Sequence, residues 1–146
     1  MKIYLATDHR GFELKEKIKG WLKERGYEYE DMGAFEFDKD DDYPDFISKA
    51  AEKVSQDPDN SRAIILGGSG QGEAMVANRY KGVRAAVYYG GSADWVVKTT
   101  REHNNSNVLS LGTSFLADDE AKKMIKLWLD TPFSGEERHK RRLSKF

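Results

Sequence analysis

The chain has 146 residues, of which 24 are basic and 25 acidic, and its formal net charge is −1. Charged residues make up 34% of the chain and apolar residues 38%, a balance typical of one globular domain with a modest core. The near-neutral charge argues against recruitment by nucleic acid or an anionic membrane, and the lack of cysteine excludes disulfides, thiolate metal sites and cysteine catalysis.

Short apolar runs alternate with helical patterns along the whole chain. We expect strands near residues 3–6, 27–31, 62–66, 83–88 and 107–111, and helices near residues 12–25, 44–56, 73–80, 95–102 and 117–129. The first helix has an apolar face formed by Leu14, Ile18, Trp21 and Leu22. Strands separated by helices indicate βαβ units, and therefore a parallel sheet covered on both faces.

Two charged segments interrupt this pattern. Residues 38–42 are acidic, lack the remaining pattern of a calcium loop, and are predicted to form a solvated loop. Residues 138–142 are basic with few apolar anchors nearby, so this end is either a solvated tail or an arm that reaches across a partner subunit. We treat residues 1–146 as one domain with an arm at about 133–146. Without a signal-peptide pattern or a long apolar run, we expect a cytoplasmic protein.

Polar clusters lie next to three of the expected strands. Ligands of parallel α/β sheets bind beyond the carboxyl ends of the strands. We place three clusters at that edge: Asp8-His9-Arg10 after the first strand, residues 67–73 after the third, and His103-Asn104-Asn105 just before the fifth.

The glycine loop at residues 67–72 favours anion binding. Gly68, Gly70 and Gly72 allow several backbone N–H groups to point into one concavity, which suits an anion or a developing oxyanion. The loop lacks the Gly-Lys-Ser/Thr of a Walker motif and the spacing of a dinucleotide fingerprint. A purely structural strand-to-helix turn remains the alternative.

Glu73 follows this loop at the start of a helix. It either complements the helix dipole or is a carboxylate aimed at a substrate on the loop. The dipole is expected to lower the pKa of Glu73, and desolvation by substrate to make it a better base. His9 and His103 are either hydrogen-bonded structural histidines or acid/base groups. No His or Cys spacing indicates a metal site.

Several motifs, taken in chain order, carry a resemblance to a known family. They are Asp8-His9-Arg10-Gly11-Phe12-Glu13-Leu14-Lys15, Asp42-Tyr43-Pro44, Gly67-Gly68-Ser69-Gly70-Gln71-Gly72-Glu73, Arg101-Glu102-His103-Asn104-Asn105 and Arg138-His139-Lys140-Arg141-Arg142. Together they resemble the ribose-5-phosphate isomerase B family, which also contains galactose-6-phosphate and allose-6-phosphate isomerases. The motifs cover nearly the whole chain.

The resemblance implies a Rossmann-like three-layer αβα sandwich with a five-stranded parallel sheet. It implies a homodimer, or a tetramer, with sites at the subunit boundary. The implied reaction interconverts ribose 5-phosphate and ribulose 5-phosphate, as in the pentose phosphate pathway, by proton transfer through an enediolate. No metal or cofactor is implied.

The resemblance also assigns roles to individual residues. The catalytic set is Glu73, His103, Asp8 and Ser69. The substrate-binding set is His9, Arg10, Tyr43, Gly68, Gly70, Gln71, Gly72, Asn104, Arg138 and Arg142. Glu73 would shuttle the proton between C2 and C1, and His103, helped by Asp8, would open the furanose ring.

In the binding set, the backbone N–H groups from Gly68 to Gly72 would hold the enediolate, with Ser69 assisting. Asn104 would bind sugar oxygens and Tyr43 would line the pocket. The phosphate would be held by His9 and by two arginines of the partner subunit, Arg138 and Arg142.

Two positions depart from the family pattern. Gly67 stands where one branch of the family has a catalytic cysteine, which matches the branch that uses Glu73. Thr113-Ser114 follows Gly112, where many members carry a phosphate-binding arginine at the second position. We hypothesise that Arg10, beside His9, replaces the missing cation.

Three alternatives to a ribose-5-phosphate isomerase remain open. The same chemistry on galactose 6-phosphate or allose 6-phosphate is the nearest. A non-catalytic phosphosugar-binding module is disfavoured because Glu73, His103 and Asn104 are all present. An NAD-binding oxidoreductase is disfavoured by the spacing of the glycine loop.

Overall fold

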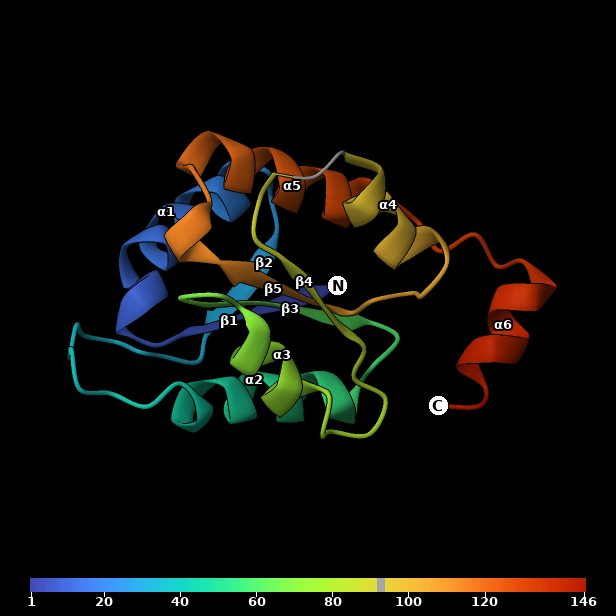
Figure 1. Cartoon of the computed structure of the whole chain (residues 1–146), viewed down its shortest axis with the longest axis horizontal. Coiled ribbons are helices and arrows are strands. Elements are labelled where there is room, and N and C mark those ends of the chain that lie inside the picture. The colour runs from blue at the N-terminus through green and yellow to red at the C-terminus, as the bar shows by residue number, and fades with distance from the viewer. Residues whose placement is uncertain (92–93) are drawn as a thin grey trace.

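A five-stranded parallel sheet forms the centre of the computed structural model, which describes residues 1–91 and 94–146 (Figure 1). Its strands are β1 (Lys2–Thr7), β2 (Glu28–Asp31), β3 (Ser61–Gly67), β4 (Ala85–Tyr88) and β5 (Val108–Gly112). They lie in the order β2-β1-β3-β5-β4, and every neighbouring pair is parallel. The expected α/β sheet is therefore confirmed, with small shifts in the strand limits.

Helices cover both faces of this sheet. They are α1 (Phe12–Glu24), α2 (Pro44–Gln56), α3 (Gln71–Ala77), α4 (Asp94–Glu102), α5 (Asp118–Asp130) and α6 (Glu137–Leu143), with short 3₁₀ turns η1 (His9–Gly11) and η2 (Thr113–Phe115). In Figure 1, α1, α4 and α5 lie on one face, and α2 and α3 lie on the other. α6 stands apart from both layers at one end of the molecule.

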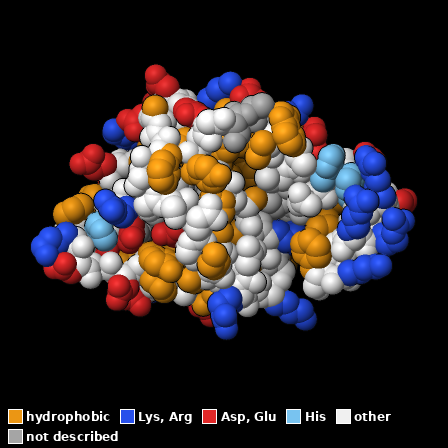
Figure 2. Space-filling model, viewed as in Figure 1, with side chains coloured by type: hydrophobic (Ala, Val, Ile, Leu, Met, Phe, Trp, Pro, Cys, Tyr) orange, Lys and Arg blue, Asp and Glu red, His pale blue; other side chains and the backbone are white. Residues whose placement is uncertain are grey.

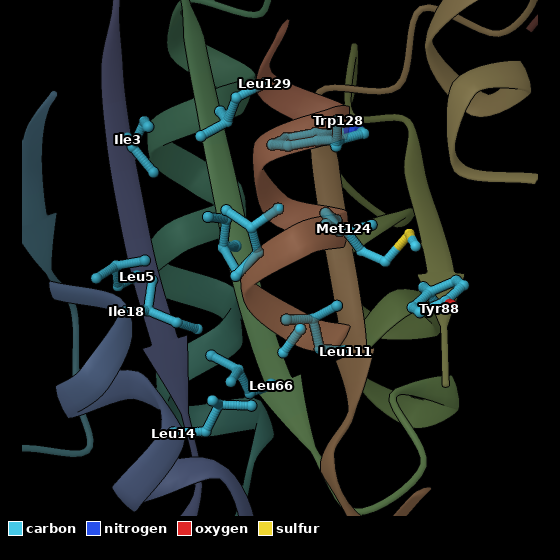
Figure 3. Close-up of a cluster of buried hydrophobic side chains, with 14 of the residues drawn as sticks. Ile3, Leu5, Leu14, Ile18, Leu66, Tyr88, Leu111, Met124, Trp128 and Leu129 are labelled. Atoms are coloured by element: carbon cyan, nitrogen blue, oxygen red, sulfur yellow. The ribbon is translucent and has the colours of Figure 1, made fainter. Parts of the chain in front are cut away.

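The core has one cluster on each side of the sheet. Ile64 and Leu66 of β3 enter the cluster beneath α1 and α5, whereas Ala63 and Ile65 enter the cluster beneath α2 and α3. Successive residues of a strand point to opposite faces, so a strand that is covered on both sides is apolar throughout. Figure 3 shows the first cluster, in which the fully buried Trp128 of α5 lies over the sheet.

The structure corrects one local expectation and adds detail to two others. α3 begins at Gln71 and ends at Ala77, because Gly70 adopts a left-handed conformation (φ +76°) before it and the Asn78 side chain bonds the backbone of Ala85 after it. The basic segment 138–142 lies within a helix, α6. Trp21 is only partly buried, with the Lys122 ammonium 5.5 Å from its ring centroid. Among the described helices, none has the length and apolar character to cross a bilayer.

Candidate active site

The carboxyl ends of β1 and β3 bring two of the polar clusters together. Thr7 pairs with Leu66 in the parallel register, and its Oγ1 donates to the Leu66 carbonyl at 3.0 Å. A Cβ on Gly11 would lie 2.3 Å from Thr7 Oγ1, so η1 packs directly on these strand ends. The strand order changes direction between β1 and β3, which is where open α/β sheets bind ligands. Asp8-His9-Arg10 therefore borders the glycine loop.

Glu73 is buried in the first turn of α3, with 4% of its surface exposed. A Cβ built on Gly67 would lie 1.7 Å from Glu73 Oε1 and 2.1 Å from its carboxyl carbon. The carboxylate thus occupies the space of a residue-67 side chain, and glycine is required for this placement. A cysteine at position 67 is incompatible with this conformation of Glu73, which gives the departure noted in the sequence a steric reason.

Burial raises the pKa of Glu73, and the negative charge of Asp8 raises it further, whereas the backbone N–H of Glu73 itself opposes both effects. The lowered pKa expected from the helix dipole is therefore wrong, because desolvation of the carboxylate outweighs donors at the helix start. A carboxylate with a raised pKa is a stronger proton acceptor once it is ionised.

Asp8 is a second buried carboxyl at this edge, with 6% of its surface exposed. Its Oδ1 accepts from the Arg10 N–H at 2.9 Å and so caps η1. Burial raises the pKa of Asp8, which the Arg10 N–H and His9 oppose. Asp8 and Glu73 are thus two carboxyl groups of perturbed pKa in one site, the arrangement from which acid/base chemistry is built.

Asp41 reaches this edge from the acidic loop. Its Oδ1 accepts from the His9 backbone N–H at 3.0 Å and lies 2.6 Å from His9 Nδ1. Only 9% of the Asp41 side chain is exposed, so the prediction of a fully solvated loop is wrong at this position. Asp8, His9 and Asp41 together offer ligand atoms within 4.8 Å of one another, a geometry that a cation could use.

The glycine loop is fixed against the end of β5. Ser110 Oγ donates to the Gly70 carbonyl at 2.6 Å, and the Ser114 N–H donates to the Gly68 carbonyl at 3.0 Å. Tyr43 borders the loop, since a Cβ on Gly72 would lie 2.6 Å from the Tyr43 hydroxyl oxygen. Ser69 and Gln71 are exposed at the surface of the loop. The loop, Tyr43 and Glu73 therefore form one surface.

Arg10 and Ser114 lie on either side of Gly68. A Cβ on Gly68 would be 3.8 Å from Arg10 Nε and 3.6 Å from Ser114 Oγ. Thr113 links the two segments, because its Oγ1 lies 3.0 Å from both the Arg10 and Gly67 carbonyl oxygens. The exposed guanidinium of Arg10 is thus next to the position from which an arginine at 114 would extend.

His103 and Asn104 lie at the opposite edge of the sheet. They precede β5, whose first residue, Val108, pairs with Ala63 and Ala85 near the starts of β3 and β4. At about 3.3 Å per residue, the length of β5 places them roughly 16 Å or more from the glycine loop. Placing this cluster at the carboxyl edge is therefore wrong, because residues that precede a parallel strand lie at its amino end.

The basic helix α6 is at the same amino edge as His103. The His139 ring stacks on the His103 ring with a centroid distance of 4.3 Å and an interplanar angle of 14°. His139 is 3% exposed, and burial together with His103 lowers its pKa. Arg138 and Arg142 are exposed on this helix. Figure 2 shows histidines at two opposite ends of one face, with lysines and arginines around the pair at the end occupied by α6.

One chain therefore divides the expected site residues into two groups. The carboxyl-edge group contains Asp8, His9, Arg10, Tyr43 and residues 68–73. The amino-edge group contains His103, Asn104, Arg138 and Arg142. Sequence reasoning missed the contacts of Asp41 and His139, although both adjoin or lie within the motifs quoted above.

The chain is similar to known proteins in both sequence and fold. The sequence profile of a family described as "Ribose/Galactose Isomerase" matches residues 3–146. A ribose-5-phosphate isomerase B of Mycolicibacterium paratuberculosis is 42% identical over 146 residues, which cover 98% of this chain and 87% of the relative. The crystal structure of ribose-5-phosphate isomerase B from Mycoplasma genitalium with bound ribulose-5-phosphate has a TM-score of 0.93 at 38% identity, covering 99% of this chain and 92% of that one. The type B ribose 5-phosphate isomerase of Trypanosoma brucei has a TM-score of 0.89 at 32% identity, covering 99% and 95%.

Proposed function

This chain belongs to the ribose/galactose isomerase family, and we propose that it interconverts ribose 5-phosphate and ribulose 5-phosphate as a cytoplasmic homodimer that needs no metal or cofactor. The names of its relatives, and the ribulose-5-phosphate bound to one of them, support this substrate. The single observation that carries the proposal is the buried Glu73 carboxylate, which is seated against Gly67 beside a glycine loop.

Glu73 is the base in this proposal. It takes the proton from C2 of the open-chain aldose and returns it to C1, while the proton of the C2 hydroxyl passes to the oxygen on C1, so that the carbonyl moves from C1 to C2. A base of raised pKa suits this step, because carbon acids are weak and proton transfer improves with the basicity of the acceptor. Asp8, the second buried carboxyl, lies close enough to influence the Glu73 charge and is proposed to assist ring opening.

The glycine loop stabilises the charge that develops during this transfer. As C2 loses its proton, negative charge builds on the carbonyl oxygen and an enediolate forms. Backbone N–H groups from Gly68 to Gly72, with Ser69, are proposed to donate to it, since fixed donors aimed at a developing oxyanion lower the barrier. The bonds from Ser110 and Ser114 to loop carbonyls support this role because they fix the loop before substrate arrives.

The remaining proposed residues come from a second copy of the chain. His103, Asn104, Arg138 and Arg142 lie at the edge opposite Glu73, so one chain alone does not assemble the full set. In a homodimer, this group of one subunit faces Glu73 of the other.

An exposed apolar surface supports this dimer. It consists of Met75, Tyr89, Trp95 and Phe115, which are 69%, 52%, 64% and 64% exposed. These residues lie on or next to elements around the edge strand β4, and Figure 2 shows apolar side chains across the middle of this face. An edge strand flanked by exposed apolar side chains is suited to burial against another chain.

The phosphate is proposed to bind between the two groups of residues. His9 and Arg10 of one subunit and Arg138 and Arg142 of the other supply the positive charge, and arginine donates in pairs to phosphate oxygens. The position of Arg10 beside Ser114 supports its role as the replacement cation. We expect Arg10→Ala to raise KM for the phosphosugar several-fold, and an unchanged KM would remove Arg10 from the site.

The test is conversion of ribose 5-phosphate to ribulose 5-phosphate by the purified protein in EDTA. Glu73→Gln should reduce kcat by roughly 10² to 10⁴, the usual contribution of a general base. Glu52→Gln, which changes an exposed glutamate on α2, is the matched control. Galactose 6-phosphate and allose 6-phosphate are assayed in parallel, because the family description also names galactose. If the wild type turns over none of these three sugar phosphates, the proposed isomerase activity is wrong.

A further inference from the structure

Asp41 makes two contacts with one residue, His9, across 32 positions of sequence. Its Oδ1 accepts from the His9 backbone N–H at 3.0 Å and lies 2.6 Å from the Nδ1 of the same residue. The first contact fixes the backbone of η1, and the second fixes the imidazole. The neighbouring residues Asp40 and Asp42 are exposed, so this contact distinguishes Asp41 from the rest of the acidic run.

A second contact restricts the orientation of the His9 ring. The Phe37 ring meets it edge to face, with a centroid distance of 6.2 Å and an interplanar angle of 88°. With Nδ1 directed at a carboxylate and the ring plane fixed, the group left to contact a ligand is Nε2. An ionised carboxylate accepts but does not donate, so Nδ1 carries the proton in this contact.

The Asp41 carboxylate is largely shielded from solvent beside His9. Asp41 Oδ2 is buried and has no hydrogen-bond partner within residues 1–91 and 94–146. Asp41 pairs with His9, and the Asp41 charge also contributes to the raised pKa of Asp8.

We propose that Asp41 is a positioning residue, which holds His9 so that its Nε2 is directed at the phosphate of the substrate. This inference rests on the proposed function, in which His9 contacts the phosphate. Asp41 itself does not touch substrate. It fixes the direction of the imidazole by holding its Nδ1, which leaves Nε2 facing the phosphate.

A cation site is the competing explanation of the same geometry, since Asp8, His9 and Asp41 offer ligand atoms within 4.8 Å. The short contact between His9 Nδ1 and Asp41 Oδ1 favours the positioning role, because each atom is already the hydrogen-bond partner of the other. The two explanations differ in what EDTA does, and the experiment therefore includes it.

The experiment measures the binding of inorganic phosphate by titration calorimetry in EDTA, together with kcat and KM for ribose 5-phosphate. The variants are Asp41→Asn, which keeps the shape and removes the charge, Asp41→Ala, His9→Asn and the double variant Asp41→Asn/His9→Asn. Asp40→Asn is the matched control, because its carboxylate is exposed and pairs with Lys39 in the same loop. Thermal unfolding establishes that each variant is folded.

We expect Asp41→Asn to weaken phosphate binding and raise KM by roughly tenfold or more, with kcat within about twofold of wild type. In the His9→Asn background the same substitution should change phosphate binding by less than about twofold, because the two residues act through one contact. Asp41→Ala should weaken binding at least as much as Asp41→Asn. Asp40→Asn should match wild type.

Four results would overturn the inference. Phosphate binding in Asp41→Asn equal to wild type would remove the role of Asp41. If Asp41→Asn weakened phosphate binding equally in the wild-type and His9→Asn backgrounds, Asp41 would act only on the fold of its loop. Phosphate binding that disappears in EDTA and returns with Mn²⁺ would make the cluster a cation site. A wild type that binds no phosphate would overturn both this inference and the phosphate subsite.

Failure of the proposed function is distinguishable from these results. If the wild type binds phosphate but does not isomerise ribose 5-phosphate, the proposed reaction is wrong. Phosphate binding by the variants still decides the role of Asp41 in that case.

Discussion

The proposed site residues are buried at the carboxyl edge of the sheet and exposed on α6 at the amino edge. At the carboxyl edge, Asp8 and Glu73 are 6% and 4% exposed and are fixed by backbone contacts within the same chain. At the amino edge, the Arg138 side chain is 56% exposed and its Nε forms an ion pair with the neighbouring Glu136 at 2.8 Å. The Glu73 and Asp8 carboxyl groups proposed for acid/base chemistry are thus placed within one chain, whereas His103 and the arginines of α6 are proposed to reach that site from a second chain.

Gly67→Ala tests the preorganised edge and should have the largest effect. The added methyl group would lie where the Glu73 carboxylate now sits, at 1.7 Å from Oε1. Displacing a catalytic group by about 1 Å costs roughly a hundredfold in rate, so kcat should fall by at least that factor. Overpacking of this buried position should also reduce the free energy of unfolding by about 1–3 kcal/mol.

Gly20→Ala is the matched control for that substitution. Gly20 lies inside α1, and a Cβ added there meets no atom within 4 Å. Alanine should therefore stabilise the helix by about 0.5–1 kcal/mol and leave kcat unchanged. Equal losses of activity in the two variants would contradict the steric relation between Gly67 and Glu73.

Arg138→Ala tests the exposed amino edge. Its effect should be smaller than that of Gly67→Ala, and it should change the kinetics but not the stability. Removing one charged donor to the phosphate should lower kcat/KM by roughly ten- to a hundredfold. The free energy of unfolding should change by less than about 0.5 kcal/mol, because the side chain is exposed. Arg141→Ala, which removes an exposed arginine from the same helix, should leave both quantities near wild type. Equal kinetic losses in the two variants would indicate a general charge effect.

The smallest of these predicted effects is a difference between wild type and Glu73→Gln in how stability depends on pH. The pKa of Glu73 is raised by folding, so its contribution to stability is full below the ordinary value of 4.5 and is lost as the pH rises through the raised value. In the proposed mechanism, activity requires the ionised Glu73 carboxylate, so activity should rise over the same pH range in which this contribution to stability is lost. The Tm of Glu73→Gln relative to wild type should therefore increase from pH 4.5 toward neutrality. A constant difference in Tm would contradict the burial argument.

The sequence predicted the elements that depend on local pattern. Apolar runs marked four of the strands, while β2 gave a weaker signal because its residues are mostly charged. Pro44 marked the start of α2, and Gly26, with φ +72°, follows the end of α1. α6 was missed because its residues are mostly charged and show no apolar face, and its buried residue, His139, is held by a ring contact with His103.

The site was less predictable than the fold for two physical reasons. His103 precedes β5 and therefore lies at its amino end, but the expectation that all three polar clusters share one edge had placed it beside Glu73. Asp41 is one of three successive aspartates, which carry the same charge, and only the folded loop brings it to His9. Glu73 was identified from its motif, but the sign of its pKa shift depends on burial that sequence does not specify.

Subunit mixing tests most directly whether the two edges belong to different chains of one site. Glu73→Gln and His103→Asn are each expected to be inactive, and are refolded or co-expressed together. Half of the resulting dimers are mixed and each mixed dimer has one intact site, so about a quarter of wild-type activity should return. Glu73→Gln mixed with Asp8→Asn should recover nothing, because both changes lie at the same edge. Activity in the first mixture no higher than in its parents would contradict a site shared between two chains.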